Sequence, residues 1–191
     1  MQENRYMLVY NIKGERKDKF EKVSEEHGFD IRYIEDFELD LKVKDLLDGN
    51  VNLKPENYVF DKEIEEGYEF VLFVNIHDDI LYNFIKDLKE VGIYIPHKAL
   101  LTKMNRDWTL DFLMQENKDE HRVMTLFGRL RGLMQMGAQI YDETQDEELK
   151  QLLIDSEEYF HPREFEFEEL REVYNNLAVK VNQLLEQRNK Q

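Results

Sequence analysis

The stretch HKALLTKMNRDWTLDFL, residues 97–113, combines the residue types that bind small anions. It holds three cations and the single tryptophan of the chain, and a helix begins in it at Asn105, Asp107 or Thr109. Ligands of open α/β sheets bind beyond the carboxyl ends of strands, and helix N-termini favour anions. The pattern therefore predicts a small anionic ligand or a nucleotide at this strand–helix corner. The candidate ligand-binding residues are Lys98, Thr102, Asn105, Arg106 and Trp108.

The same corner also has a purely structural interpretation. A helix that follows a strand needs a capping residue whether or not a ligand binds there. In this interpretation Asn105 or Asp107 caps the helix, Trp108 staples it to the sheet, and the cations stay in water. Both interpretations are carried forward.

Other kinds of chemistry have no support in the residue pattern. The chain has no cysteine, which excludes disulfides, zinc ribbons, cysteine nucleophiles and iron–sulfur clusters. It contains no P-loop, nucleophile elbow, glycine-rich dinucleotide turn or HExxH motif. His121 and His161 do not form the paired Glu-x-x-His units of a di-metal site. We therefore assign no catalytic residue, no metal ligand and no cofactor, and the sequence favours a protein that is not an enzyme.

Alternating strands and helices position the corner. Strands are predicted at residues 6–12, 31–34, 68–76 and 93–102, and helices near residues 15–27 and 78–91. The strand at 68–76 is apolar for most of its length, which favours a central place, whereas Pro96 favours an edge place for the last strand. This alternation predicts an α/β fold with a mostly parallel four-stranded sheet.

The region of residues 35–67 is the ambiguous part of this fold. The preferred interpretation is a short helix starting near Asp40, followed by a long connection that contains Pro55. The alternative is a ferredoxin-like α+β arrangement, in which residues 35–67 contribute strands instead of a helix.

The remainder of the chain is predicted to be helical. One or two helices run from Trp108 to about Ile140, a short helix lies near residues 147–156, and a final helix has apolar residues at heptad spacing. We expect a helical hairpin or a small bundle. The predicted organisation is an α/β domain over residues 1–118 and an acidic helical region over residues 119–191.

Negative charge is concentrated in this helical region. The chain has a net charge of −16, which argues against nucleic acid and against anionic membranes as partners. Residues 141–172 hold 13 acids against three bases, a net charge of −10. The acids are Asp142, Glu143, Asp146, Glu147, Glu148, Asp155, Glu157, Glu158, Glu164, Glu166, Glu168, Glu169 and Glu172. This segment is a docking surface for a basic protein partner or for a second copy of the chain, a cation site, or a solvated helix face.

No stretch of the sequence suggests export or membrane insertion. The segment MQENRYMLVYNI lacks the basic start and long apolar core of a signal peptide. No apolar run approaches the roughly 18 residues of a membrane-spanning helix. We expect a soluble, cytoplasmic protein.

Three motifs between residues 68 and 121 resemble an uncharacterised bacterial domain-of-unknown-function family. They are VLFVNI, LKEVGI and KALLTKMNRDWTL, and in the second Lys89 lies three residues before Gly92. The resemblance implies a Lys-Ala-x-x-Thr-x-x-Asn-x-x-Trp signature. Its residues here are Lys98, Ala99, Thr102, Asn105 and Trp108. It implies no particular activity, ligand or partner.

Two functional hypotheses follow. The first is a non-catalytic interaction or regulatory module that acts through its acidic helical region. The second is a small-anion or nucleotide-binding domain that uses the corner at residues 98–108.

Overall fold

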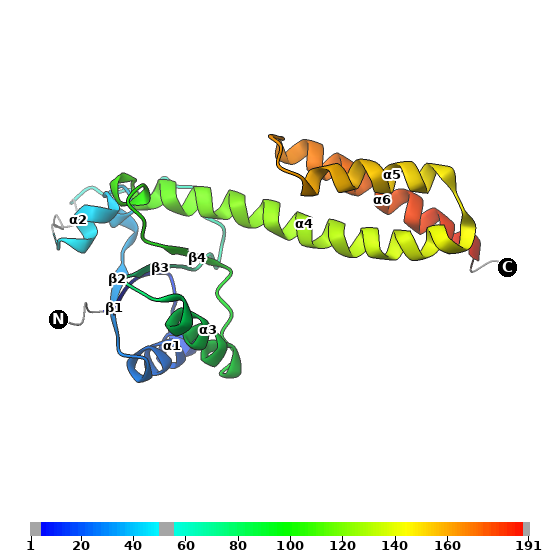
Figure 1. Cartoon of the computed structure of the whole chain (residues 1–191). Coiled ribbons are helices and arrows are strands. Elements are labelled where there is room, and N and C mark those ends of the chain that lie inside the picture. Colours follow the sequence, from blue (N-terminus) through cyan, green and yellow to red (C-terminus); the bar gives the residue numbers. More distant parts are fainter. Residues whose placement is uncertain (1–4, 50–55, 189–191) are drawn as a thin grey trace. The chain divides into compact units, whose positions relative to one another are not determined.

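The computed structural model describes residues 5–49 and 56–188 of the chain (Figure 1). Pro55 of the predicted long connection lies outside the described residues. The chain divides into two compact units, residues 1–119 and residues 120–191. Helix α4 (Leu110–Thr144) contributes its first residues to the first unit and the rest to the second.

A four-stranded mixed sheet forms the centre of the first unit. Its strands are β1 (Arg5–Tyr10), β2 (Phe29–Ile34), β3 (Phe70–Val74) and β4 (His97–Leu100). Their order is β2-β1-β3-β4. β1 pairs with β2 and β3 pairs with β4 in parallel, whereas β1 and β3 are antiparallel. The predicted four strands and mostly parallel pairing are confirmed, and the central antiparallel pair was not predicted.

The antiparallel pair follows from the two kinds of connection in this unit. A parallel pair needs a crossover, which is usually helical. Helix α1 (Gly14–Glu26) connects β1 to β2, and α3 (Asp78–Glu90) connects β3 to β4. The chain from β2 to β3 passes through η1 (Asp36–Glu38) and α2 (Val43–Leu47) and returns beside β1 in the opposite direction. The two parallel pairs therefore have their carboxyl ends at opposite ends of the sheet.

The ferredoxin-like alternative is wrong. It required strands from residues 35–67, but the described residues of that region contain only η1, α2, turns and one isolated bridge, between Lys42 and Thr109. The short helix predicted to start near Asp40 begins at Val43. Val43 and Leu46 are fully buried and lie three residues apart, on one face of a helix. Their helical spacing, and not the overlapping alternation typical of a strand, therefore describes this segment.

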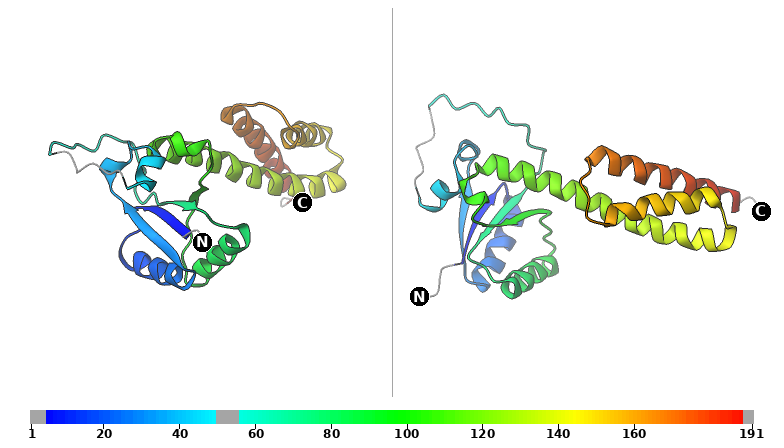
Figure 2. Two further views of the ribbon diagram at one scale, coloured as in Figure 1. Left: turned by 60° about the vertical axis from the view of Figure 1, so that its left-hand side comes forward. Right: turned by 45° about the horizontal axis from the view of Figure 1, so that its top comes forward.

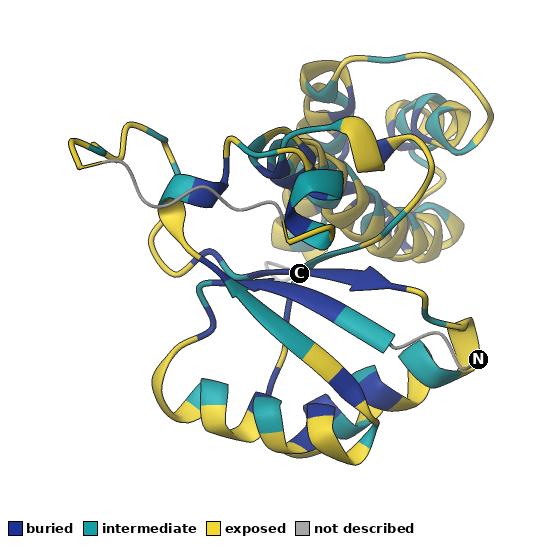
Figure 3. Ribbon diagram, turned by 90° about the vertical axis from the view of Figure 1, so that its left-hand side faces the viewer, coloured by how far each residue is buried: buried dark blue, intermediate teal, exposed yellow. Residues whose placement is uncertain are grey.

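Apolar side chains cover both faces of the sheet. On one face, Met7 and Val9 pack against α1 and α3, and Phe84 of α3 belongs to the same cluster. Leu8 and Tyr10 alternate with them and pack on the other face, against α2 and the first turns of α4. Figure 3 shows buried strands with helices on either side of the sheet in this unit. Burial of both faces explains why the first strand does not alternate between apolar and polar residues.

Three helices pack around one core in the second unit. They are α4 from Glu120 onward, α5 (Glu147–Glu157) and α6 (Phe167–Arg188), with the short η3 (Glu158–Phe160) between the last two (Figure 2). The buried residues of this core are Leu126, Leu130, Ile140, Leu149, Leu170, Leu177 and Val181. The apolar heptad positions predicted in the final helix face this core. In the part of the chain that the structure describes, no helix is long and apolar enough to span a membrane.

Candidate functional site

The residues after β4 form a tight hydrogen-bonded turn. The Thr102 backbone N–H donates to Asn105 Oδ1 (2.8 Å), and the Asn105 N–H donates to Thr102 Oγ1 (3.1 Å). The Asn105 amide also donates to the carbonyl of Leu100 (2.9 Å). Asn105 is 7% exposed, so its side chain satisfies the backbone where the strand ends. Two of the five predicted ligand-binding residues are therefore engaged with each other.

This turn joins the start of α4 to the segment around α2. The Val43 N–H donates to the carbonyl of Trp108 (2.9 Å), and Arg106 lies 4.0 Å from the exposed carboxylate of Asp48. Trp108 packs on the apolar cluster between the sheet and α2, with its ring 4.9 Å from that of Phe112. The predicted stapling role of Trp108 agrees with this packing.

Of the three residues predicted to begin the following helix, Asn105 and Asp107 are wrong and Thr109 is right. Asn105 and Asp107 belong to the short η2 (Asn105–Asp107), and α4 begins only at Leu110. Thr109 caps α4, because its Oγ1 accepts a hydrogen bond from the N–H of Phe112 (3.2 Å). Asp107 instead pairs with Lys44 of α2 (2.7 Å).

Lys98 lies apart from the other four predicted residues. It stands at the amino end of β4, whereas Thr102 to Trp108 follow the carboxyl end, and a strand advances about 3.3 Å per residue. Successive strand residues also point to opposite faces, and Ala99 packs on the same cluster as Trp108. The Lys98 side chain therefore faces α3. The structure brings Thr102, Asn105, Arg106 and Trp108 into one joint and separates Lys98 from it.

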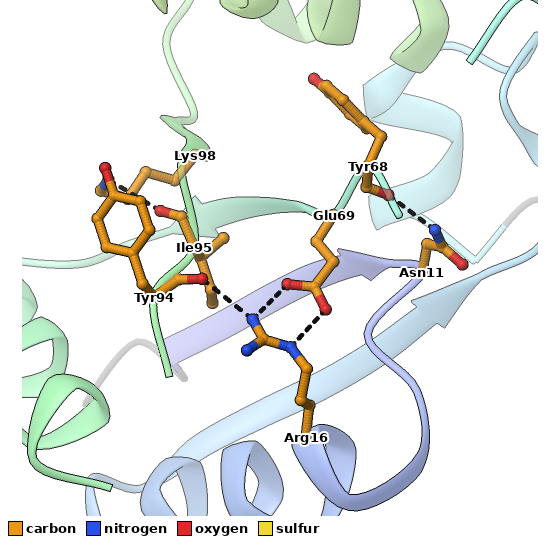
Figure 4. Close-up of polar contacts among 7 residues, drawn as sticks. All are labelled: Asn11, Arg16, Tyr68, Glu69, Tyr94, Ile95 and Lys98. Atoms are coloured by element: carbon orange, nitrogen blue, oxygen red, sulfur yellow. Dashed lines mark hydrogen bonds and ion pairs between the residues drawn. The ribbon is translucent and has the colours of Figure 1, made fainter. Parts of the chain in front are cut away.

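Lys98 lines a cavity of about 270 Å³ between α3 and β4. The lining combines apolar residues with two lysines, Lys89 and Lys98, and with Tyr94. Lys98 Nζ donates to the carbonyl of Ile95 (3.2 Å) and lies 6.0 Å from the centre of the Tyr94 ring (Figure 4). An ammonium group has three donors, so Lys98 can bind a further acceptor.

The cavity lowers the proton affinity of its central lysine. Burial, and then the charge of Lys89, lower the pKa of Lys98 from its ordinary value of 10.5. Lys98 therefore loses its proton at a lower pH than an exposed lysine does. An anion in the cavity would offset both effects, because it would pair with the ammonium group and screen the repulsion between the two lysines.

An ion pair between Arg16 and Glu69 holds one wall of this cavity in place. Arg16 of α1 donates through Nε to Glu69 Oε1 (2.8 Å) and through a terminal nitrogen to Glu69 Oε2 (2.6 Å). The same guanidinium donates to the carbonyl of Tyr94 (3.0 Å), as Figure 4 shows. A bidentate pair of this kind fixes geometry as well as charge. It ties the Tyr94 backbone to α1 and to the start of β3.

The carboxyl ends of β1 and β2 enclose a separate cavity of about 210 Å³. Its polar groups are largely satisfied by one another. The Tyr10 hydroxyl donates to Asp36 Oδ1 (2.9 Å), and the Tyr58 hydroxyl donates to the carbonyl of Asp36 (2.9 Å). Burial, then the hydrogen bond to Asp36, raise the pKa of Tyr10 above its ordinary value. These contacts explain the cavity as local structure.

Internal ion pairs neutralise part of the acidic segment 141–172. Lys180 of α6 lies 2.9 Å from Asp146 and 2.5 Å from Glu148, and its side chain is 12% exposed. Arg163 lies within 4.0 Å of Glu158 and Glu169. Several exposed carboxylates of the segment have no ion pair with another described residue. These are Asp142, Glu157, Glu164, Glu166 and Glu172.

The middle of the chain matches the model of a known sequence family. Residues 69–124 match a family described as a domain of unknown function (DUF3783). The match supports the predicted resemblance to an uncharacterised family for this segment, whereas the Lys-Ala-x-x-Thr-x-x-Asn-x-x-Trp signature and a bacterial origin stay predictions. Comparisons with curated proteins and with solved structures gave no match. The matched segment contains the Lys98 cavity and the joint at residues 102–108.

The sequence did not identify Lys89 and Tyr94 as neighbours of Lys98. Lys89 was noted only as part of the motif LKEVGI. A usable signal was available, because Lys89 lies in the last turn of a helix and Lys98 lies near the start of the parallel strand that the helix leads to. Tyr94 carried no such signal, since its place depends on the loop held by Arg16.

Proposed function

We propose that the protein is a non-catalytic interaction or regulatory module that binds a basic protein partner through its acidic helical region. The observation that supports this proposal is the set of exposed carboxylates in residues 141–172 without an ion pair to another described residue. Internal pairs such as Lys180 with Asp146 already stabilise the fold of this unit. The remaining carboxylates stay hydrated and are available to a partner rich in lysine and arginine.

A charge-neutralised full-length variant tests this proposal. The variant Glu157→Gln, Glu164→Gln and Glu166→Gln removes three exposed charges without touching the core. A matched control removes three exposed charges of the first unit, through Glu25→Gln, Glu26→Gln and Glu66→Gln. Each protein is immobilised, and the captured proteins are identified and then rebound in purified form.

We expect the acidic-segment variant to lose binding of an identified basic partner that the wild type and the control retain. Because contacts between exposed charges are screened, binding should also weaken as salt is raised. Equal retention by all three proteins would contradict the proposal. Sedimentation of the wild type alone distinguishes self-association through the same helices.

The Lys98 cavity favours a second candidate function, the binding of a small anion. This proposal keeps Lys98 from the predicted set and adds Lys89 and Tyr94 to it. Inorganic phosphate should raise the melting temperature of the wild type, and Lys98→Met should reduce that rise. Lys103→Met is the control, because Lys103 is an exposed lysine outside the cavity. Trp108 fluorescence is unsuitable as a reporter, since Trp108 packs on the opposite face of the sheet. A rise of equal size in the wild type and in Lys98→Met would remove this candidate.

A further inference from the structure

A cationic groove lies within the otherwise acidic second unit. Its volume is about 430 Å³, and Arg122 and Arg129 of α4 line it together with Arg171 of α6. Among the described residues, the lining includes no carboxylate. Residues 121–140 likewise contain no aspartate or glutamate, in a chain that has 42 of them. Positive charge is therefore gathered at one place in a negatively charged protein.

The packing of α4 beside α6 brings the three arginines together. The Arg122 guanidinium lies 4.5 Å from the centre of the Phe167 ring, and a Cβ at Gly137 would lie 3.5 Å from Val181. From the first contact to the second, both helices advance toward their C-termini by nearly the same number of residues. The helices therefore run parallel. This register places Arg171 between the levels of Arg122 and Arg129. The latter two are seven residues apart, about 10 Å along the helix.

The three groove arginines differ in their contacts within the protein. Arg129 is exposed and has no ion-pair partner in the part of the chain that the structure describes. Arg171 pairs with Glu168 one helical turn away, and both side chains are more than half exposed. An exposed pair of this kind contributes little, so a ligand anion can replace Glu168. Arg122 is held over Phe167, which limits the freedom it would lose on binding.

From this arrangement we infer that the groove binds an organic phosphate with an aromatic body, of about mononucleotide size. Guanidinium groups form paired hydrogen bonds with phosphate oxygens, and a phosphomonoester carries close to two negative charges at neutral pH. The rings of Phe167 and Tyr174 line the same groove and offer faces for a planar group. The volume lies within the range of about 300–1,000 Å³ that is usual for small-molecule sites.

Calorimetric titration of the full chain with AMP at low salt tests this inference. Adenosine and inorganic phosphate serve as fragments that each lack one half of the recognised group. The test variants are Arg129→Ala and the polar, uncharged Arg129→Gln, since Arg129 is exposed and both variants should fold. The matched control is Arg131→Ala, an exposed arginine of the same helix that packs by Phe160 outside the groove.

We expect AMP to bind the wild type and the Arg131→Ala control with the same affinity. Both Arg129 variants should bind at least about tenfold more weakly, as expected for the loss of one charged hydrogen-bonding group. Adenosine should not bind, and inorganic phosphate should bind more weakly than AMP. Lys98→Met should leave AMP binding unchanged, because its cavity lies in the other unit.

Three results would overturn the inference. They are the absence of AMP binding at millimolar concentration, equal affinity in the wild type and both Arg129 variants, and equal affinity for AMP and inorganic phosphate. This test is independent of the proposed acidic interaction surface. The variant with neutralised Glu157, Glu164 and Glu166 retains every groove arginine and should bind AMP as the wild type does.

Discussion

At the residue scale, polar side chains of one short stretch have different roles. Asn105 satisfies three backbone and side-chain hydrogen bonds where β4 ends, and it is buried there. Lys98, seven residues earlier, has a single acceptor among the described residues and lines a cavity. These hydrogen bonds account for the polar groups of Asn105. The ammonium group of Lys98, by contrast, has three donors and keeps some of them for a further acceptor. Lys98 is therefore the residue of the predicted set most suited to bind a ligand.

The lowered pKa of Lys98 predicts a pH-dependent effect on stability. Burial and Lys89 lower this pKa below 10.5, so between the folded and unfolded values the unfolded chain binds more protons than the folded protein. The contribution of Lys98 to the free energy of unfolding therefore rises with pH in that window, and its cost is fully present below it. In Lys98→Met this dependence is absent.

Urea titrations of the wild type and Lys98→Met at several pH values measure this effect. The stability of the wild type relative to the variant should increase as the pH rises from neutral toward 10.5. Other titrating groups are shared by both proteins, so the difference isolates Lys98. A difference that stays constant, or that falls with pH, would show that the cavity does not disfavour the charged lysine.

At the element scale, α4 is one helix despite the glycines at positions 128, 132 and 137. The sequence left one helix or two open, because glycine costs about 1 kcal/mol relative to alanine inside a helix. At Gly137 the missing side chain has a packing reason, since a Cβ there would lie 3.1 Å from Leu153 of α5. At Gly128 and Gly132 nothing lies within 4 Å of such a Cβ.

Alanine substitutions should separate these two cases. Gly128→Ala and Gly132→Ala should each stabilise the protein by about 0.5–1 kcal/mol, because they restrict the unfolded chain and meet no neighbour. Gly137→Ala should give a smaller gain, since Leu153 must move to admit the methyl group. Thermal and urea unfolding of the three variants check this order. An equal increase in the free energy of unfolding for all three variants would show that Leu153 of α5 moves aside without a loss of stability.

At the scale of the whole molecule, two units have separate apolar cores. The first is built on both faces of the mixed sheet, and the second on α4, α5 and α6. Charge is also divided within the second unit, where residues 121–140 carry three arginines and no acid, and residues 141–172 carry a net charge of −10. The same unit can therefore present both an acidic surface and a cationic groove.

Separate cores predict that a core substitution in the second unit acts mainly on that unit. Leu177 of α6 is fully buried in the core of the second unit, so Leu177→Ala should destabilise this unit by about 2–5 kcal/mol. Hydrogen exchange should show faster exchange in α5 and α6, with the amides of β1 and β3 still protected. Phe73→Leu, in the sheet of the first unit, is the reciprocal control. Uniformly faster exchange in both units after Leu177→Ala would show a single cooperative structure.

Elements with strong periodicity could be predicted from sequence. The apolar run at β3 and the spacing in α3 and α6 identify these elements, because burial of an apolar face needs no distant partner to be recognised. The sequence also excluded cysteine chemistry and located the acidic segment. It offered stapling of a helix to the sheet as one of two interpretations of Trp108, and Trp108 packs on the apolar cluster between the sheet and α2.

Only the tertiary structure decided which of these residues meet. The direction of β3 relative to β1 depends on the long connection before it, and this direction sets which ends of the strands lie together. Lys98 separates from Asn105 because side chains alternate along a strand, and the register of that strand is fixed by its pairing with β3. Arg171 meets Arg122 and Arg129 because α4 and α6 run parallel, although more than forty residues separate them in sequence. Residue types come from the sequence, whereas distances between them come from pairing and packing across the chain.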